Sequence, residues 1–362
     1  MSPTAAPTHS TIINDQRWYD TAGAEIRAGH GGQLTKVDGT WYWVGTDPDK
    51  PANGMDIHLY SSATLGDGTW EHRGIVVHAT PDEYTMANCR LARHPDGHFI
   101  IIGKAMRIYS SPTVDGPYTL EPTPNIPTYN NRPALDPATG LYVEGVHRHK
   151  YGGGSLFLDD GFDNDGSPTV TAYYITSRKI LYDTAGVPLN SRSVGIYKLQ
   201  DDWLDFEADT AEVYWGPNMR REAMFLHKRN GMYYMSSSHT SGWKPSNTYF
   251  RTASQLSGPW SDESQLAFVP ALTETGYSVK SHGCQFRYLI DVGGDRWMFG
   301  GDRYPVEDAE IWDPQDGRHI RMPVVWSNGV PTVYWRREWN VAAHNGTNTT
   351  SESHARVPGV DR

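Results

Sequence analysis

Cysteine is scarce in this sequence, which excludes a fold held together by disulfides. The 362 residues include two cysteines, Cys89 and Cys284. Neither stands in a CxxC motif or at a Cys/His spacing that would hold a metal ion. We therefore expect two free, buried thiols, as in proteins of a reducing cytoplasm.

Long apolar runs and basic runs are absent as well. No window approaches the roughly 18 apolar residues that span a bilayer, and residues 1–18 lack the basic start and apolar middle of a secretory signal. The 32 Lys and Arg against 42 Asp and Glu give a net charge of −10, which disfavours nucleic acid as a partner. We expect no membrane partner, and a cytoplasmic protein as the sequence stands, or a secreted one if a leader was removed. The oligomeric state is left open.

Helical periodicity is nearly absent, whereas turns and aromatic strands recur. There are 36 Gly and 24 Pro, and few windows place apolar residues at i, i+3, i+4 and i+7. Runs such as GTWYWVGTD from residue 39, GMYYMSSSH from residue 231 and DRWMFGGDR from residue 295 begin at a turn and continue into an aromatic strand. This pattern predicts an all-β protein.

The spacing of these units favours a β-propeller. Units about 40 to 70 residues apart fit propeller blades better than a sandwich, in which turns come every 8 to 12 residues. The sequence therefore predicts a five-bladed β-propeller over residues 13–340, with disordered segments at 1–12 and 341–362. Two stacked sandwiches are the alternative.

Four stretches, in this order along the chain, resemble glycoside hydrolase family 43. DTAGAEIRAGHGGQLTKVDGTWYWVGTD (20–47) resembles its opening blade, and SLFLDDG with TAYYITS (155–177) its third blade. REAMFLHKRNGMYYMSSSHTSGW (221–243) resembles its acid-bearing strand, and CQFRYLIDVGGDRWMFGGDRY (284–304) its last blade. The similarity is greatest to the branch of exo-β-1,3-galactanases.

The resemblance implies a glycosidase with a pocket on the propeller axis. Glu222 matches the general acid of the family residue for residue, and Gln285 matches the glutamine that this branch has in place of an aspartate base. A neutral amide is a poor base, so Gln285 would position water or act through an imidic tautomer. The alternatives are a surface salt bridge for Glu222 and an amide that satisfies backbone groups for Gln285.

The two arginines before Glu222 bear on its acidity, because a nearby cation lowers the pKa of a carboxyl group. Strand alternation predicts that Arg221 points away from Glu222 and that Arg220 shares its face. The same alternation predicts that Cys284 points away from a pocket that Gln285 faces.

Further residues are expected to contact the sugar. His30, in GHGG, would bind sugar hydroxyl groups or a structural ion at the channel, with a packed residue as the alternative. Trp243 and Asn247, in SGWKPSN, suit a stacking platform and a hydroxyl contact, with core packing as the alternative for Trp243. Arg220 completes this set. The resemblance also allows a structural calcium ion in the axial channel, and no other cofactor is expected.

Two acidic positions of the family are vacant in this chain. The second blade has NCRLAR (88–93) or NNRPAL (130–135) where the family has ERPK, so Cys89 and Asn131 become candidates for substrate contacts. GGG (152–154) stands where the family has RD before SLF. Replacement carboxylates would be Glu144, Asp159 or Asp160, although the two aspartates are also typical turn residues.

The sequence thus predicts an exo-acting, inverting glycosidase that releases galactose from β-1,3-linked chains. An arabinofuranosidase or galactofuranosidase of the same family is the second interpretation. A catalytically inactive propeller that binds oligo- or polysaccharide is the third.

Overall fold

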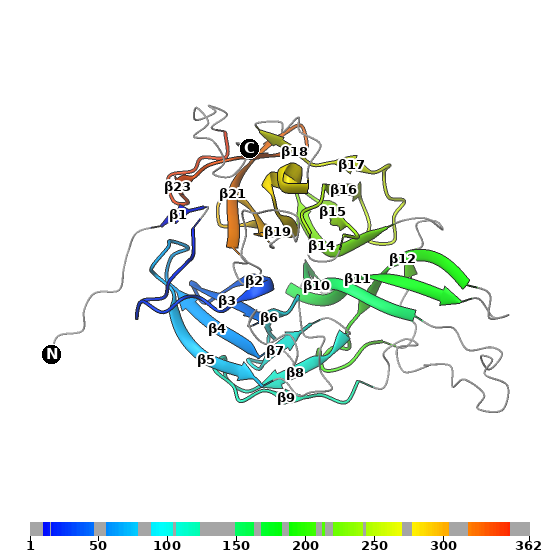
Figure 1. Cartoon of the computed structure of the whole chain (residues 1–362). Helices are drawn as coiled ribbons and strands as arrows, with labels where there is room; N and C mark the ends of the chain where they lie inside the picture. The colour runs from blue at the N-terminus through cyan, green and yellow to red at the C-terminus, as the bar shows by residue number, and fades with distance from the viewer. Residues whose placement is uncertain are drawn as a thin grey trace.

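The chain forms five small sheets around a central axis in the computed structural model (Figure 1). The structure describes residues 10–14, 16–46, 56–78, 88–103, 106–123, 149–162, 168–182, 188–207, 212–213, 220–241, 244–269, 277–303 and 318–347. The five sheets follow one another along the sequence, so each is a blade. The predicted five-bladed β-propeller is confirmed.

Four blades are antiparallel sheets in which the four strands follow chain order. The first consists of β2 (Gly29–Val37), β3 (Thr40–Thr46), β4 (Ile57–Ser62) and β5 (Glu71–Val77). The second consists of β6 (Arg90–Arg93), β7 (Phe99–Ile102), β8 (Ile108–Ser111) and β9 (Thr119–Leu120). The third consists of β10 (His149–Phe162), β11 (Pro168–Tyr182), β12 (Pro188–Lys198) and β13 (Glu212–Val213). The fourth consists of β14 (Arg221–Arg229), β15 (Met232–His239), β16 (Thr248–Ala253) and β17 (Ser264–Gln265).

The fifth blade has an additional parallel strand. Its antiparallel strands are β19 (Gln285–Asp291), β20 (Trp297–Arg303), β21 (Arg318–Ser327) and β22 (Val330–Tyr334), and β18 (Ala267–Val269) pairs with β22 in parallel. Strand β1 (Thr11–Ile13) pairs with β23 (Glu338–Asn340), which brings the two ends of the fold together. Ile12 and Val341, which lie just outside the expected limits of 13 and 340, are both buried.

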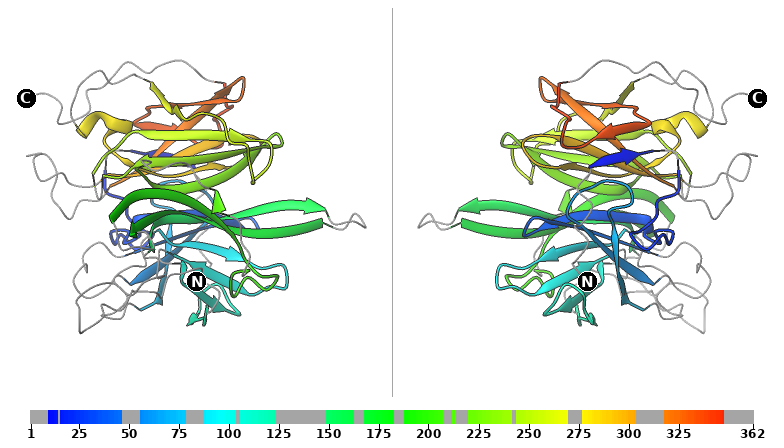
Figure 2. Two further views of the ribbon diagram at one scale, coloured as in Figure 1. Left: turned by 90° about the vertical axis from the view of Figure 1, so that its right-hand side faces the viewer. Right: turned by 90° about the vertical axis from the view of Figure 1, so that its left-hand side faces the viewer.

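Helix contributes almost nothing to the described residues. The helical segment with bounds in the described part of the chain is the 3₁₀ helix η2 (Tyr277–His282), and Met106 adds one further residue in 3₁₀ conformation. No helix in this part of the chain is long and apolar enough to cross a membrane. The side views show the sheets stacked as the blades of one body, with strands of the third sheet extending beyond it (Figure 2). Two stacked sandwiches are therefore wrong as an interpretation.

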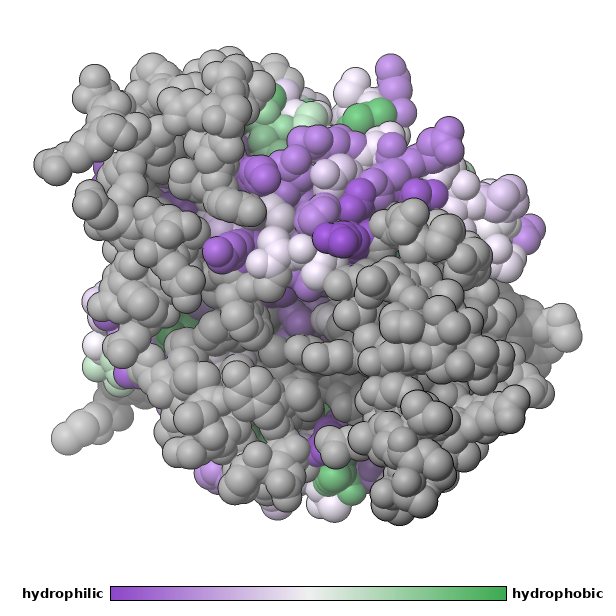
Figure 3. Space-filling view, turned by 45° about the vertical axis from the view of Figure 1, so that its right-hand side comes forward, coloured by the Kyte–Doolittle hydropathy of each residue, from purple (hydrophilic) through white to green (hydrophobic). Residues whose placement is uncertain are grey.

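The hydrophobic core lies between neighbouring blades. One cluster joins Val44 and Leu59 of the first blade to Leu91 and Ile101 of the second. Others join the second blade to the third, the third to the fourth, and the fourth to the fifth and first. Each sheet thus buries both faces against other sheets, which is why the strands have few polar positions in their central residues. Among the coloured residues in Figure 3, hydrophilic side chains predominate and a few small apolar groups are visible.

Many of the aromatic residues pack inside the protein. The Arg321 guanidinium is buried among three indoles, at 4.3 Å from the ring centroid of Trp18, 4.1 Å from Trp43 and 5.1 Å from Trp70. A desolvated cation over aromatic faces gains more than an exposed one. The high tryptophan content is thus explained largely by core packing, and only in part by any surface that would stack on sugars.

The innermost strands are irregular near their first residues. Bulges interrupt the register of β2 between Gly29 and Gln33, of β10 between Tyr151 and Gly154, and of β14 between Glu222 and Phe225. Strand β19 has a further bulge between Phe286 and Tyr288. A bulge changes the direction of the side chains beside it, and such features are frequent at binding and active sites. The irregular ends of these strands are therefore where a site is expected.

We expect Gly154→Ala to destabilise the third blade. A Cβ atom at Gly154 would lie 2.1 Å from the backbone oxygen of Ile175, and overpacking of this kind typically costs about 1–3 kcal/mol. Gly161, on the same strand, is a matched control because a Cβ there would meet only the Thr169 hydroxyl, at 3.3 Å. Urea unfolding of both variants measures the difference. Equal free energies of unfolding for Gly154→Ala and Gly161→Ala would contradict the steric argument.

Candidate active site

Glu222 lies at the start of β14, immediately before the bulge. The next residue, Ala223, has a positive φ of 52°, which turns the backbone at this point. The Glu222 side chain is half-buried, and its Oε1 accepts a hydrogen bond from the backbone N–H of Ser241 at 3.1 Å. Among the described residues no hydrogen-bond donor contacts Oε2. One oxygen of the carboxyl group is thus held in place, while the other is available to a ligand or a proton.

Gln285, from the neighbouring blade, contacts the same carboxyl group. Its amide Nε2–H donates to Glu222 Oε1 at 2.7 Å and to the Ser238 hydroxyl at 3.2 Å. Arg287 Nη2 donates to Gln285 Oε1 at 2.9 Å. Because a guanidinium group only donates, it fixes which end of the amide is the oxygen. The predicted meeting of Glu222 and Gln285 is observed, across 63 residues of sequence (285 − 222).

A buried ion pair between Arg287 and Asp302 lies next to Gln285, on the side away from Glu222. Arg287 Nε donates to Asp302 Oδ2 at 2.6 Å, and its Nη1 donates to Asn88 Oδ1 at 2.7 Å. Asp302 Oδ1 lies 3.3 Å from Nδ1 of His319. Burial alone would raise the pKa of Asp302, but the Arg287 and His319 contacts outweigh it and hold that pKa well below its usual range. Asp302 is therefore an anion at neutral pH, and its charge is neutralised by Arg287.

The backbone around this network is shaped for close approach. A Cβ atom on Gly153 would lie 2.5 Å from Asn88 Nδ2 and 3.5 Å from the backbone nitrogen of Ala223. Gly153 thus allows the second, third and fourth blades to meet next to Glu222. A larger residue at Gly153 would push the Asn88 amide, which contacts Arg287, out of its place.

The two arginines before Glu222 have different surroundings. Arg221 Nε donates to Glu263 Oε2 at 2.9 Å, and its guanidinium lies 4.0 Å from the ring centroid of Tyr249. Arg221 therefore pairs with a carboxylate other than Glu222, as strand alternation predicts. Arg220 is exposed, and no ion pair joins it to Glu222 in the described part of the chain. The salt-bridge interpretation of Glu222 is not supported.

A hollow of about 340 Å³ opens beside Glu222. Ser241, whose N–H contacts the carboxyl group, is one of its lining residues; the others include Arg220, Asn247, Lys244 and Lys280. The pKa of His239, also in the lining, is lowered by burial and by the nearby cations Arg221, Lys280 and Arg220. The hollow is thus polar and electropositive, and it brings together Arg220 and Asn247, two of the residues predicted to contact the substrate.

Several predicted residues cannot be placed. Trp243 and Asn131 lie outside the described residues, as does Glu144. His30 belongs to the bulged part of β2, but its side chain is likewise outside what the structure describes. Their proposed contacts, and the calcium ion in the axial channel, stay predictions.

The two cysteines are buried and unbonded, as predicted. Burial raises the pKa of each thiol to about 12. Cys89 packs among Val44, Ile57 and Leu91 with no exposed surface. A thiol enclosed in an apolar cluster offers no atom to a sugar, so this geometry argues against Cys89 as a substrate contact; its neighbour Asn88 is the residue that joins the polar network.

Asp159 and Asp160 are neither turn residues nor neighbours of Glu222. Both lie within strand β10, and Asp159 accepts hydrogen bonds from Lys228 Nζ at 2.8 Å and from the Tyr233 hydroxyl at 2.6 Å. Lys228 is six residues after Glu222 on β14, about 20 Å along a strand. Asp159, Asp160 and Lys228 line a separate cavity of about 540 Å³, at the end of β14 opposite to Glu222. Neither aspartate replaces the missing carboxylates beside Glu222.

Arg287, Asp302 and Asn88 were not singled out from the sequence. Signals for two of them were present: Arg287 is two residues after Gln285 on one strand, and Asp302 lies in the GDRY motif of the next strand, where it pairs in register with Gln285. Asn88 stands at one of the two stretches that replace ERPK. The pairing of neighbouring strands and the shared face of one strand would have identified Asp302 and Arg287. The contact with Asn88 depends on how the second and fifth blades pack.

Solved structures similar to this chain include enzymes of glycoside hydrolase family 43. A GH43 β-1,3-galactosidase superposes with a TM-score of 0.66 at 20% identity, over 92% of this chain and 64% of its own. A glutamate-to-glutamine variant of an exo-β-1,3-galactanase from Phanerochaete chrysosporium, with β-1,3-galactotriose, gives 0.65 at 21% identity, over 91% and 68%. Another GH43 β-1,3-galactosidase, with galactodeoxynojirimycin, gives 0.64 at 22% identity, over 91% and 100%.

These likenesses establish the architecture. The chain spans about two thirds of the length of the first two of these proteins. No family model matches the sequence, and no curated protein matches it. Fold and site together define a five-bladed β-propeller with a carboxyl–amide pair near its axis. At this level of identity, the activity of the neighbours is not transferred by similarity alone.

Proposed function

We propose that the chain is a glycoside hydrolase that acts on β-1,3-linked galactosides, is exo-acting and inverts the anomeric configuration. The observation that carries the proposal is the contact between Glu222 and Gln285, two residues from different blades, at the bulged ends of the innermost strands. The neighbours in fold are β-1,3-galactosidases and exo-β-1,3-galactanases, one of them with a β-1,3-linked galactose trimer, which suggests the substrate class.

Glu222 is suited to protonate a leaving oxygen. Its Oε1 is occupied by the donors of Gln285 and Ser241, so a proton on the carboxyl group would reside on Oε2. Glycoside cleavage needs such an acid on one side of the scissile bond.

Gln285 is better suited to hold Glu222 than to act as a base. Its amide oxygen accepts from Arg287, and a cation at that oxygen reduces its ability to take a proton from water. In inverting glycosidases the two catalytic groups are about 6.5–9.5 Å apart to admit water. Here the amide contacts the acid directly, so we assign to Gln285 the orientation of the carboxyl group.

The function is tested with β-1,3-galactobiose and β-1,3-galactotriose as substrates. Release of galactose from the trimer one unit at a time supports exo action, whereas dimers released from the middle of longer chains contradict it. Proton NMR during the first turnovers reads the anomer: α-galactose from a β-linkage supports inversion, and β-galactose contradicts it. Arabinofuranosides and galactofuranosides in the same panel test the second specificity, and binding without any hydrolysis would favour the inactive carbohydrate-binding propeller.

Gln285→Ala is expected to lower kcat on β-1,3-galactobiose about 10²-fold, the size of effect that a misplacement near 1 Å produces. The loss should be much smaller for aryl galactosides with a good leaving group, because these need little protonation. Steady-state kinetics on both substrates measures the ratio. A loss of equal size on both would instead assign Gln285 to the attacking water, since every substrate needs that water.

A further inference from the structure

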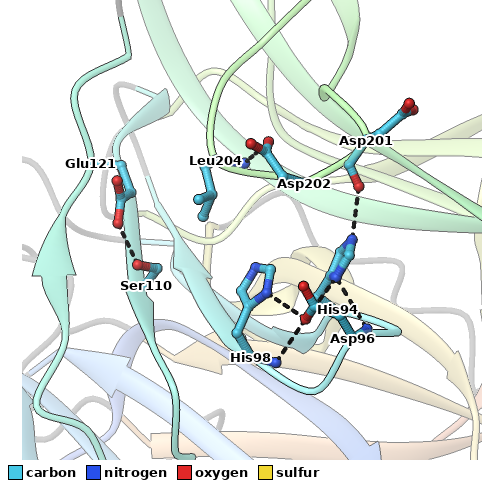
Figure 4. A network of polar contacts seen from close by, with 8 residues as sticks. All are labelled: His94, Asp96, His98, Ser110, Glu121, Asp201, Asp202 and Leu204. Carbon is cyan, nitrogen blue, oxygen red and sulfur yellow. Dashed lines mark hydrogen bonds and ion pairs between the residues drawn. The ribbon is translucent and has the colours of Figure 1, made fainter.

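A second constellation of ionisable groups lies in the turn between β6 and β7. The sequence HPDGH, residues 94–98, places His94, Asp96 and His98 together (Figure 4). One ligand atom from each lies within 4.8 Å of the others, and the three form the one such group of His, Cys, Asp and Glu among the described side chains. The turn is distinct from the site at Glu222, which is built from the fourth and fifth blades.

The hydrogen bonds of His94 define its tautomer. His94 Nε2 lies 2.8 Å from the backbone oxygen of Asp201, which can only accept, so this nitrogen carries a proton. In the neutral ring, Nδ1 then has a lone pair, which accepts from the backbone N–H of Asp96 at 3.2 Å. The same Nδ1 lies 2.9 Å from Asp96 Oδ1. Two acceptors this close repel each other unless a proton or a metal cation lies between them.

His98 faces the same carboxylate oxygen. Its Nδ1 lies 2.6 Å from Asp96 Oδ1, and its ring stacks on that of His94 with centroids 4.5 Å apart. His98 Nε2 is buried and has no hydrogen-bond partner. The backbone N–H of His98 also donates to Asp96 Oδ1, at 3.1 Å. The turn therefore presents two imidazole nitrogens to one carboxyl oxygen, Asp96 Oδ1.

We propose that His94 Nδ1, Asp96 Oδ1 and His98 Nδ1 bind one divalent transition-metal ion of the zinc class. Imidazole and carboxylate ligands suit Zn²⁺, with bonds of about 2.0–2.2 Å and a fourth position left to water. Tetrahedral geometry sets such ligand atoms roughly 3.3 Å apart. Asp96 is largely exposed, at 62% of its side-chain surface, so it has room to move by the roughly 0.4 to 0.7 Å that separates its present contacts, at 2.9 Å and 2.6 Å, from this spacing.

The surroundings of His94 resemble those of metal-binding histidines. Ligating imidazoles commonly donate their second N–H to a carbonyl group, which fixes the tautomer and the ring, and the Asp201 carbonyl occupies this position. The edge of Trp203 packs against the ring at 4.8 Å. Asp201 and Trp203 follow β12, so a bound ion would join the turn of the second blade to the third blade. An ion that binds only the folded chain stabilises it.

Calorimetric titration of the tag-free chain with ZnCl₂ tests the site, with Asp96→Asn and His98→Gln as variants. His78→Gln is the matched control, because His78 is exposed at 78% of its side chain and lies outside the turn. We expect one equivalent bound by the wild type and by His78→Gln, at least tenfold weaker binding by both site variants, and a thermal midpoint that rises with Zn²⁺ only where binding is retained. Co²⁺ should give the visible absorption of a tetrahedral complex.

Three results would overturn the site: no saturable binding by the wild type, an unchanged affinity in both site variants, or a loss of affinity in His78→Gln equal to theirs. Circular dichroism checks that each variant is folded. If one of the two site variants fails to fold, the other still tests the site. Galactoside hydrolysis is followed in parallel. Because the turn and Glu222 are in different blades, zinc binding stands or fails independently of the proposed hydrolase activity.

Discussion

Glu222→Gln is expected to lower kcat on β-1,3-galactobiose by about 10²- to 10⁴-fold, the range of general acid catalysis. The amide has nearly the same shape as the carboxyl group but has no acidic proton to give to the leaving oxygen. Aryl galactosides with a good leaving group need little protonation and should be hydrolysed with a much smaller loss. Steady-state kinetics on the two substrates measures both effects, and binding of the dimer should be retained.

Glu207→Gln is the control for the loss of a negative charge. Glu207 pairs with Lys198 at the outer part of the third blade, a surface ion pair of small energetic value. Its removal should leave kcat within about twofold. If Glu222→Gln also leaves hydrolysis of the natural linkage within about threefold, Glu222 is not the general acid.

Arg287→Met is expected to destabilise the fold by about 3–5 kcal/mol at pH 7, the typical loss when one partner of a buried ion pair is removed. The change leaves the Asp302 carboxylate buried without its main cation and deprives Gln285 and Asn88 of a donor. Urea unfolding measures the free energy, and kcat on β-1,3-galactobiose should fall as well because Gln285 is no longer held. The double variant Arg287→Met with Asp302→Asn should recover part of the stability.

The pH dependence of this loss has a definite sign. In the wild type the pKa of Asp302 is lowered on folding, so its contribution is complete above the unfolded value of about 3.9 and is lost as the pH falls below it. In Arg287→Met the buried carboxyl group favours its neutral form, and this variant gains relative stability as the pH falls. The difference between the two proteins should therefore shrink from pH 7 to pH 4.5.

Arg73→Met provides a matched comparison in an exposed pair. Arg73 also contacts an aspartate through two nitrogens, at 3.0 Å and 2.7 Å from the oxygens of Asp115, but both side chains are at the surface. Water screens such a pair, so we expect Arg73→Met to lower the free energy of unfolding by less than about 1 kcal/mol. Its difference from the wild type should not shrink between pH 7 and pH 4.5. Similar losses for Arg73→Met and Arg287→Met would show that burial of Asp302 is not what makes Arg287 important.

The sequence by itself determined the class of fold and the position of one carboxyl group on a strand. Alternating aromatic and small residues between glycine turns encode strands, because the side chains of a strand alternate between its two faces. Their spacing distinguished a propeller from a sandwich. The motifs around Glu222 and Gln285 also indicated that both residues belong to one site. Strand alternation predicts that Arg221 points away from Glu222, and Arg221 pairs with Glu263 instead.

Only the tertiary structure decided what surrounds that carboxyl group. The bulges of β14 and β19 lie beside Glu222 and Gln285, and no periodic pattern reveals a bulge. Asn88 meets Arg287 across 199 residues, and Gly153 provides the space for it. Contacts between blades depend on how whole sheets pack, which is set by many small apolar contacts together, whereas strand identity is set by neighbours in sequence. That difference in range is why the sequence located the acid, and the folded chain alone located its support.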